Sequence, residues 1–182
     1  NTMTAGSSWG IGKTLTTTAM CNMMRVIRQL SRWLRSTFRR PHMTGAEWRF
    51  LCANLETTDR LLEFGSGQST KEFANRVAEV HSVEHNAGWF HRISQQCQHM
   101  PNVNIHLVQA RHYTAVLDQL PSFDVVVIDG RFRNRCGVEV INNLKVKHRV
   151  FVHDWFRRQY HRLLDTYEIL GRVDDLVKLE KK

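Results

Sequence analysis

Apolar runs and amphipathic stretches alternate along the chain from residue 44 onward. Strands are predicted where short apolar or alternating runs occur, at residues 60–64, 80–84, 103–108, 123–129, 149–152, 167–173 and 176–180. Helices are predicted where apolar positions recur at helical spacing, after Thr44, over residues 70–78, 87–99 and 112–120, near 135–144 and near 160–166. Strands that alternate with helices in this way predict an α/β domain.

Two of these segments indicate how the sheet is built. Residues 125–128 are a continuous run of Val and Ile, which is the pattern of a parallel strand covered on both faces. Too few residues separate 167–173 from 176–180 for a crossover connection, so these two strands must pair as an antiparallel hairpin. The sequence therefore predicts one domain with a Rossmann-like, doubly wound and mostly parallel sheet that ends in a C-terminal antiparallel hairpin.

The first 43 residues follow a different pattern. Residues 1–22 are rich in Thr, Ser and Gly and have no apolar period, which predicts a disordered or non-native leader. Residues 23–43 are predicted to form a basic amphipathic helix or arm, with an apolar stripe opposite a stripe of arginines. Such a helix can dock on its own domain, lie on an anionic membrane surface, bind RNA or serve as an organelle presequence. The predicted α/β domain covers residues 44–182.

Charge narrows the class of partner. The chain of 182 residues is 42% hydrophobic and has a formal net charge of +9, and its isoelectric point near 9.9 would usually suggest nucleic-acid binding. However, residues 1–43 hold seven basic residues and no acidic one, which gives +7, whereas the remainder carries 19 − 17 = +2. The basic arm is therefore the part of the sequence that predicts a nucleic-acid partner.

Hydropathy excludes a membrane-spanning helix, and cysteine spacing excludes a cysteine-based metal or redox site. No stretch approaches the roughly 20 consecutive apolar residues of a membrane-spanning helix, so the expected membrane contact is at most peripheral, through the arm. The cysteines are scattered without metal-ligand or redox spacing, at Cys21, Cys52, Cys97 and Cys136. Reduced thiols of this kind predict a cytoplasmic location, or an organellar one if residues 23–40 act as a presequence.

The ends of the first two predicted strands carry a pattern typical of nucleotide binding. Gly65 and Gly67 follow Glu63 and allow a tight turn with close backbone approach to a ligand, and a helix begins near Ser69 with its amides directed at the site. The second strand ends at Glu84, where a carboxylate is placed to accept both hydroxyls of a ribose. The simpler alternatives are a plain strand-to-helix turn and a solvated acid at a strand end.

With these motifs the chain resembles the class I S-adenosylmethionine-dependent methyltransferases over residues 44–182. Residues 61–67 (LLEFGSG) are similar to the family's first motif, residues 83–84 to its ribose-binding acid, and residues 124–130 (DVVVIDG) to its fourth-strand motif. The resemblance implies S-adenosylmethionine as cofactor. The residues it implies for cofactor binding are Glu63, Phe64, Gly65, Ser66, Gly67, Ser69, Thr70, Glu84, His85, Arg111 and Asp129.

The ends of the fourth and fifth predicted strands are similar to a small O-methyltransferase-like branch with an I-D-G … H-D pattern. Some relatives in that branch bind a divalent metal at these ends, and the carboxylates of Asp129 and Asp154 are hard oxygen ligands suited to Mg²⁺. Asp129 can instead contact the methionine part of the cofactor or cap a turn. His153 is the candidate general base, with Asp129 as a second catalytic residue, because imidazole titrates near neutral pH. The alternative for His153 is a hydrogen bond to a neighbouring loop.

Arginines and aromatic residues follow the same two strands. Six guanidiniums are expected to surround the substrate opening, from Arg131, Arg133, Arg135, Arg157, Arg158 and Arg162. Bidentate pairing would favour phosphate or carboxylate groups on the acceptor. The expected substrate-binding residues are Arg131, Arg133, Arg157 and Trp155, and the stacking surface also includes Phe132, Phe156 and Tyr160. The alternative is a set of solvated arginines on helix surfaces.

These observations leave three hypotheses. The first is a methyltransferase acting on an oxygen of an anionic metabolite, glycan or nucleic acid, which acts mainly by positioning the nucleophile. The second is a non-catalytic methyltransferase fold that serves as a binding or assembly module and uses its basic arm to hold RNA, a membrane or a protein partner. The third, a nicotinamide-dependent oxidoreductase, is disfavoured because Thr70 stands where the dinucleotide motif has Gly or Ala.

Overall fold

The computed structural model of the chain describes residues 42–143 and 146–182. The predicted leader and almost all of the predicted basic arm therefore lie outside the described residues. The helices are α2 (Gly45–Cys52), α3 (Gln68–Ala74), α4 (Ala87–Cys97) and α5 (Arg133–Asn142), with 3₁₀ helices η1 (Ala110–His112), η2 (Ala115–Gln119) and η3 (Arg158–Asp165). The strands are β1 (Arg60–Phe64), β2 (Glu79–Glu84), β3 (Val103–Leu107), β4 (Phe123–Ile128), β5 (Val146–Val152), β6 (Tyr167–Val173) and β7 (Leu176–Lys181).

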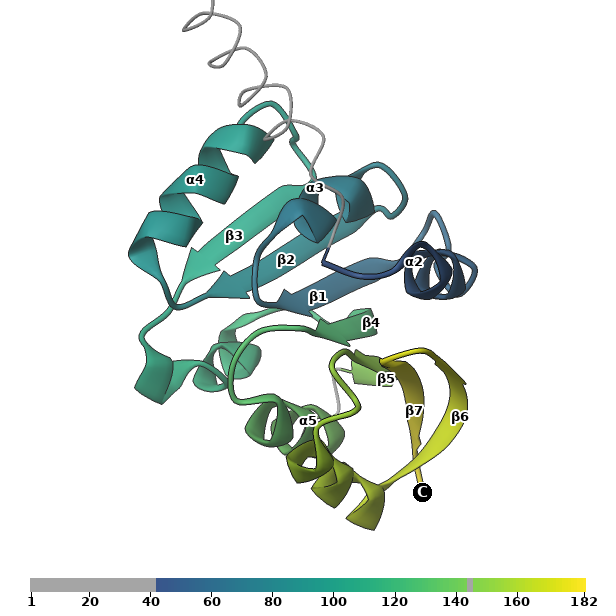
Figure 1. The fold of residues 1–182 in the computed structure, drawn as a ribbon. Helices are drawn as coiled ribbons and strands as arrows, with labels where there is room; N and C mark the ends of the chain where they lie inside the picture. Colours follow the sequence, from purple (N-terminus) through teal and green to yellow (C-terminus); the bar gives the residue numbers. More distant parts are fainter. Residues whose placement is uncertain (1–41, 144–145) are drawn as a thin grey trace, which may run out of the picture. The chain divides into compact units, whose positions relative to one another are not determined.

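The seven strands form one sheet in the order β3-β2-β1-β4-β5-β7-β6 (Figure 1). Strands β1 to β5 pair in parallel, whereas β7 pairs antiparallel with both β5 and β6. This confirms the predicted doubly wound sheet with its C-terminal hairpin. The strand order reverses between β1 and β4, and in such sheets ligands bind at the carboxyl ends of the strands beside that point.

Two predicted helices are 3₁₀ helices in the structure. Residues 112–120 are divided between η1 and η2, and residues 160–166 fall within η3 and the residue after it. The buried side chains of η3 are Tyr160 and Leu163, three positions apart. A 3₁₀ turn places residues three apart on one side, so the core contacts favour the tighter helix here.

Alternate residues of the strands face two separate core clusters. Leu62 and Phe64 of β1 pack with the α5 and η3 side, whereas Leu61 packs with the α2 and α3 side. Residues 125–128 of β4 are fully buried, as expected of a strand covered on both faces. This alternation puts Glu63 on the α3 side of the sheet, beneath the turn that follows β1.

Helix α2, predicted to follow Thr44, begins with a capping box. The Thr44 hydroxyl accepts a hydrogen bond from the Glu47 amide at 3.1 Å, and the Glu47 carboxylate accepts one from the Thr44 amide at 2.6 Å. Within residues 42–143 and 146–182, none of the helices combines the length and the apolar character needed to span a bilayer.

Candidate functional site

The turn after β1 passes very close to the loop after β4. Gly65 has φ +103°, and a Cβ placed on it would lie 2.5 Å from the Cα of Gly130. The Gly65 amide donates to the Val83 carbonyl at 2.9 Å, and the Asp129 amide donates to the Phe64 carbonyl at 3.1 Å. Position 65 requires glycine for two reasons, the left-handed backbone and the close approach to Gly130, which leaves no room for a Cβ. The carboxyl ends of β1, β2 and β4 are thus held together as one edge.

Glu63 lies beneath this turn and has no exposed surface. Its carboxylate accepts hydrogen bonds from the hydroxyls of Ser69 and Thr70, and from Ser82 at 2.7 Å. Burial raises the pKa of Glu63 to about 7, against the three hydroxyl hydrogen bonds, which lower it. The Thr70 hydroxyl also accepts a hydrogen bond from the Gly67 amide at 2.9 Å. Glu63 therefore stabilises the turn from its interior side, through Thr70.

Glu84 lies at the end of β2 and is 4% exposed. Its Oε1 accepts hydrogen bonds from the amides of His85 and Asn86 at 2.8 and 2.7 Å, and its Oε2 accepts one from the Ser66 hydroxyl at 3.2 Å. The Nδ1 atom of His85 is buried without a hydrogen bond, although it lies 3.0 Å from Oε1 in a contact that lacks hydrogen-bond geometry. A carboxylate beside an unsatisfied ring nitrogen fits the ribose end of a nucleoside ligand.

The remaining predicted cofactor residues are divided between the surface and the interior. Arg111 is exposed in η1, and its carbonyl accepts a hydrogen bond from Arg135 at 3.2 Å. Phe64 is fully buried and packs against Tyr113, so only its backbone reaches the turn. Ser69 and Thr70 are buried and face Glu63. The buried residues among them therefore support the turn after β1 from the interior. The polar groups left to contact a ligand are the backbone of that turn and the carboxylate of Glu84.

A chain of charged groups connects α2 to the ends of β4 and β5. His153 Nδ1 lies 2.9 Å from Asp129 Oδ1, and His153 Nε2 lies 3.5 Å from Glu47 Oε2. Burial lowers the pKa of His153, but the hydrogen bond to Asp129 and the charges of the neighbouring carboxylates outweigh burial and raise it above its ordinary value. His153 was predicted to be a general base. Both ring nitrogens of His153 face carboxylates inside the protein, and this geometry favours a positioning role for the imidazole.

Arg133 lies at the centre of the same cluster and is 7% exposed. Its Nη2 atom contacts Asp129 Oδ1 at 3.1 Å and Asp154 Oδ2 at 3.0 Å. It also donates to three backbone carbonyls, those of Asp129, Gly130 and His153. The guanidinium of Arg133, predicted to bind substrate, thus has its donors occupied inside the protein.

The same arrangement bears on the predicted magnesium site. Asp129 and Asp154 lie close together as predicted, but one guanidinium group bridges them where a divalent cation would have to bind. In the part of the chain that the structure describes, no group of three or more His, Cys, Asp or Glu side chains could hold a metal ion. These residues therefore do not fit a Mg²⁺ site.

The predicted substrate residues also differ in exposure. Arg131 and Arg157 are exposed at the carboxyl ends of β4 and β5. Trp155 is only 2% exposed and belongs to the core cluster on the α5 side. The structure thus places the Trp155 ring, predicted to contact substrate, in the interior of the protein.

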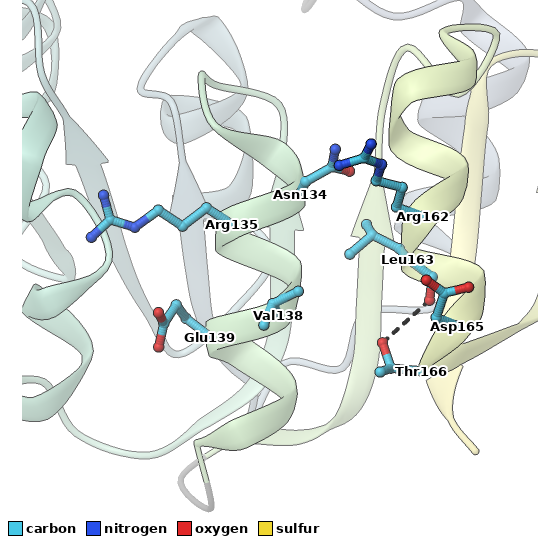
Figure 2. A pocket seen from close by; sticks show the side chains of 8 residues that line it. All are labelled: Asn134, Arg135, Val138, Glu139, Arg162, Leu163, Asp165 and Thr166. Carbon is cyan, nitrogen blue, oxygen red and sulfur yellow. Dashed lines mark hydrogen bonds between the residues drawn. The ribbon is translucent and has the colours of Figure 1, made fainter.

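Arg135 and Arg162 lie in a different place from the one expected. They line a groove of about 410 Å³ between α5 and η3, shown in Figure 2. The other lining residues are Asn134, Val138, Glu139, Leu163, Asp165 and Thr166. None of these is a predicted cofactor residue, so this groove is separate from the turn after β1.

Two residues of the site were not singled out from the sequence. Glu47 belongs to the capping box of α2, and its carboxylate also lies 3.5 Å from His153 Nε2 and accepts the Asp175 amide at 2.8 Å. Tyr113 is fully buried and donates to the Val83 carbonyl at 3.0 Å, behind the turn. No local pattern marks either contact, because the partners are distant in the sequence.

Comparison with known proteins gives structural matches only. No protein-family model matches the sequence, and the search of curated protein sequences gives no match. A methyltransferase-like protein from Silicibacter pomeroyi is 24% identical with a TM-score of 0.67, covering 79% of this chain and 88% of that one. An rRNA methylase from Streptococcus thermophilus is 14% identical with a TM-score of 0.55, covering 79% and 98%. A precorrin 8w decarboxylase from Methanobacterium thermoautotrophicum is 18% identical with a TM-score of 0.55, covering 81% and 94%.

Proposed function

Because the chain has the fold of class I S-adenosylmethionine-dependent methyltransferases, we propose that it transfers a methyl group from that cofactor to an oxygen of an acceptor carrying negative charge. The observation that carries the proposal is the carboxylate of Glu84 at the end of β2, beside the unsatisfied Nδ1 of His85 and the turn at Gly65. Methyltransferase names among the similar structures support it. A fold alone does not fix an activity, so the proposal depends on this site.

The residues of the site have distinct proposed parts in methyl transfer. The bound cofactor would supply an electrophilic methyl group on its sulfonium. Glu84 would accept hydrogen bonds from the ribose, while the backbone around Gly65 and Gly67 would lie against the cofactor's methionine end. Asp129 has its Oδ1 held by His153 and Arg133, so its second carboxylate oxygen is the one left to orient an approaching group. Positioning of this kind is the main catalytic contribution expected at such a site.

The negative charge of the acceptor is proposed from the loops after β4 and β5. Arg131 and Arg157 are exposed there, and Arg157 stays half-exposed although it pairs with Asp154 at 3.4 Å. A guanidinium pairs with phosphate or carboxylate through two parallel hydrogen bonds. The cytoplasmic location is a further proposal, supported by the free thiols of Cys52, Cys97 and Cys136.

Calorimetric titration of S-adenosylhomocysteine into the full chain tests the cofactor site. We expect the wild type to bind, and Glu84→Gln to weaken binding by about 10- to 150-fold, since a hydrogen bond to a charged group is worth about 1.5–3 kcal/mol. The matched control is Glu79→Gln at the opposite end of the same strand, where the carboxylate pairs with Arg60 and His81. This control should bind as the wild type does.

The same titration separates methyl transfer from the second hypothesis, a non-catalytic binding module. A folded wild-type chain that does not bind S-adenosylhomocysteine would exclude the methyltransferase function. Equal weakening by Glu79→Gln and Glu84→Gln would show that the ligand does not bind at the end of β2.

A further inference from the structure

Two phenylalanines are exposed at the carboxyl ends of the adjacent strands β4 and β5. Phe132 is 44% exposed and Phe156 is 58% exposed. The other aromatic residues of these loops, Trp155 and Tyr160, are buried, at 2% and 8%. The structure therefore divides the aromatic side chains of this edge into two that support the core and two that face solvent.

Hydrogen bonds and an ion pair connect the two segments that carry the exposed rings, one after β4 and one after β5. Arg133, next to Phe132, donates to the His153 carbonyl and forms an ion pair with Asp154 at 3.0 Å. The Asn134 side chain donates to the Gln159 carbonyl at 2.7 Å. Because these contacts cross between the two loops, the backbone segments that carry the two phenylalanines are held next to each other.

The backbone of these two loops enters the left-handed region at two places. Phe132 and Asp154 both have φ +58°, a conformation that Asp tolerates but that an aromatic residue rarely occupies, so the strain lies at Phe132. Such a conformation costs about 1–3 kcal/mol and is found most often at functional sites. The ring of Phe132 meets Tyr113 only edge-on, with centroids 5.9 Å apart, and much of it stays in solvent. Core packing of this ring therefore does not account for the strain.

Each exposed ring has an exposed arginine as its chain neighbour. The guanidinium of Arg157 lies 5.4 Å from the ring centroid of Phe156 and 3.4 Å from Asp154. Arg131 precedes Phe132 and is exposed. The two acids of these loops, Asp129 and Asp154, both pair with the buried Arg133, and Asp154 also pairs with Arg157.

We propose that Phe132 and Phe156, with Arg131 and Arg157, bind a single-stranded segment of nucleic acid. Bases would stack on the two rings, and the backbone phosphates would pair with the two guanidiniums. The inference rests on the proposed function, because it names nucleic acid as the acceptor brought to the site. It assigns the recognition to the loops after β4 and β5 and not to the basic arm.

Fluorescence anisotropy with a labelled oligouridylate of about 12 nucleotides tests the proposal on the full chain. Stacking is worth about 1–3 kcal/mol per base, so Phe156→Ala and Phe132→Gly should each weaken binding by about 5- to 150-fold. Phe132→Tyr keeps a ring and should bind as the wild type does. Arg157→Ala should reduce the slope of log affinity against log salt concentration by about 1, the change expected for the loss of one phosphate contact.

Two controls separate stacking from folding and from charge. Glycine relieves the left-handed strain, so Phe132→Gly should unfold at the same or a higher urea concentration than the wild type while it binds the oligonucleotide less tightly. Heparin, a polyanion without bases, should bind the phenylalanine variants as it binds the wild type. Ile169→Ala, at an exposed apolar residue of β6, should leave oligonucleotide binding unchanged.

The outcomes are distinct for the two proposals. Unchanged oligonucleotide affinity in Phe132→Gly and Phe156→Ala would overturn the stacking surface. A wild type that binds S-adenosylhomocysteine but no oligonucleotide would overturn it as well and leave the methyltransferase function intact. Failure of the methyltransferase function is detected separately, by the absence of S-adenosylhomocysteine binding.

Discussion

Gly65 and Gly130 pass each other so closely that neither has room for a side chain. A Cβ on Gly65 would lie 2.5 Å from the Gly130 Cα, and one on Gly130 would lie 2.9 Å from the Gly65 Cα. The two residues belong to the loops after β1 and β4, the neighbouring strands where the sheet order reverses. Their contact lets the proposed cofactor turn and the loop of Asp129 meet at one edge.

Gly65→Ala should therefore destabilise the protein, by about 2–6 kcal/mol, from a strained positive φ and a clash with backbone atoms that cannot move aside. Gly67→Ala is the matched control, because a Cβ there would make only ordinary van der Waals contacts, with the Ser69 hydroxyl at 3.5 Å and the Ser69 amide nitrogen at 4.0 Å. Its cost should be within about 1 kcal/mol. Urea unfolding of both variants checks the prediction, and equal losses would contradict it.

Arg133→Ala should cost about 3–5 kcal/mol, because it leaves the carboxylates of Asp129 and Asp154 without their shared partner in a mostly buried cluster. Arg157→Ala removes a half-exposed guanidinium from the same Asp154 and should cost less than about 1 kcal/mol. Urea unfolding of the two variants is the measurement. A loss for Arg133→Ala as small as that for Arg157→Ala would show that the cluster is not stabilised through this guanidinium.

Glu63 should make the folded state less stable as the pH rises from 4.5 to about 7. Its pKa is raised from 4.5 to about 7 in the folded chain, so the unfolded chain releases this proton first. The loss over that window should reach about 3 kcal/mol. Glu63→Gln cannot ionise and should flatten this part of the stability curve, measured by urea unfolding across the window. Parallel curves for the wild type and the variant would rule the effect out.

His153 should contribute a second pH dependence, at higher pH. Its folded pKa lies above 6.5, so the stability it provides is complete below pH 6.5 and is lost as the pH rises through the folded value. His153→Gln removes this loss. Urea unfolding between about pH 6 and 9 should show a steeper decline for the wild type than for the variant. A wild type whose stability stays constant over that range would contradict the raised pKa of His153.

Part of the site follows from local sequence patterns. The turn at Gly65 and the carboxylate at the end of β2 each combine a strand end with residue types whose chemistry is local, so their positions at one edge of the sheet could be predicted. The roles of Arg133, Trp155 and His153 could not. An arginine or a tryptophan just after a strand has the same local pattern whether it points outward or inward. Only the partners across the β4 and β5 loops distinguish the two orientations.

The sequence by itself determined the order of strands and helices, the parallel sheet and the C-terminal hairpin, because hydrophobic period and connection length act over a few residues. The tertiary structure decided which charged groups meet. Asp129 and Asp154 are 25 positions apart and share one guanidinium, and Glu47 reaches His153 across 106 positions. Coulomb interactions depend on distance in space and on burial. Neither quantity exists until the strands are packed side by side.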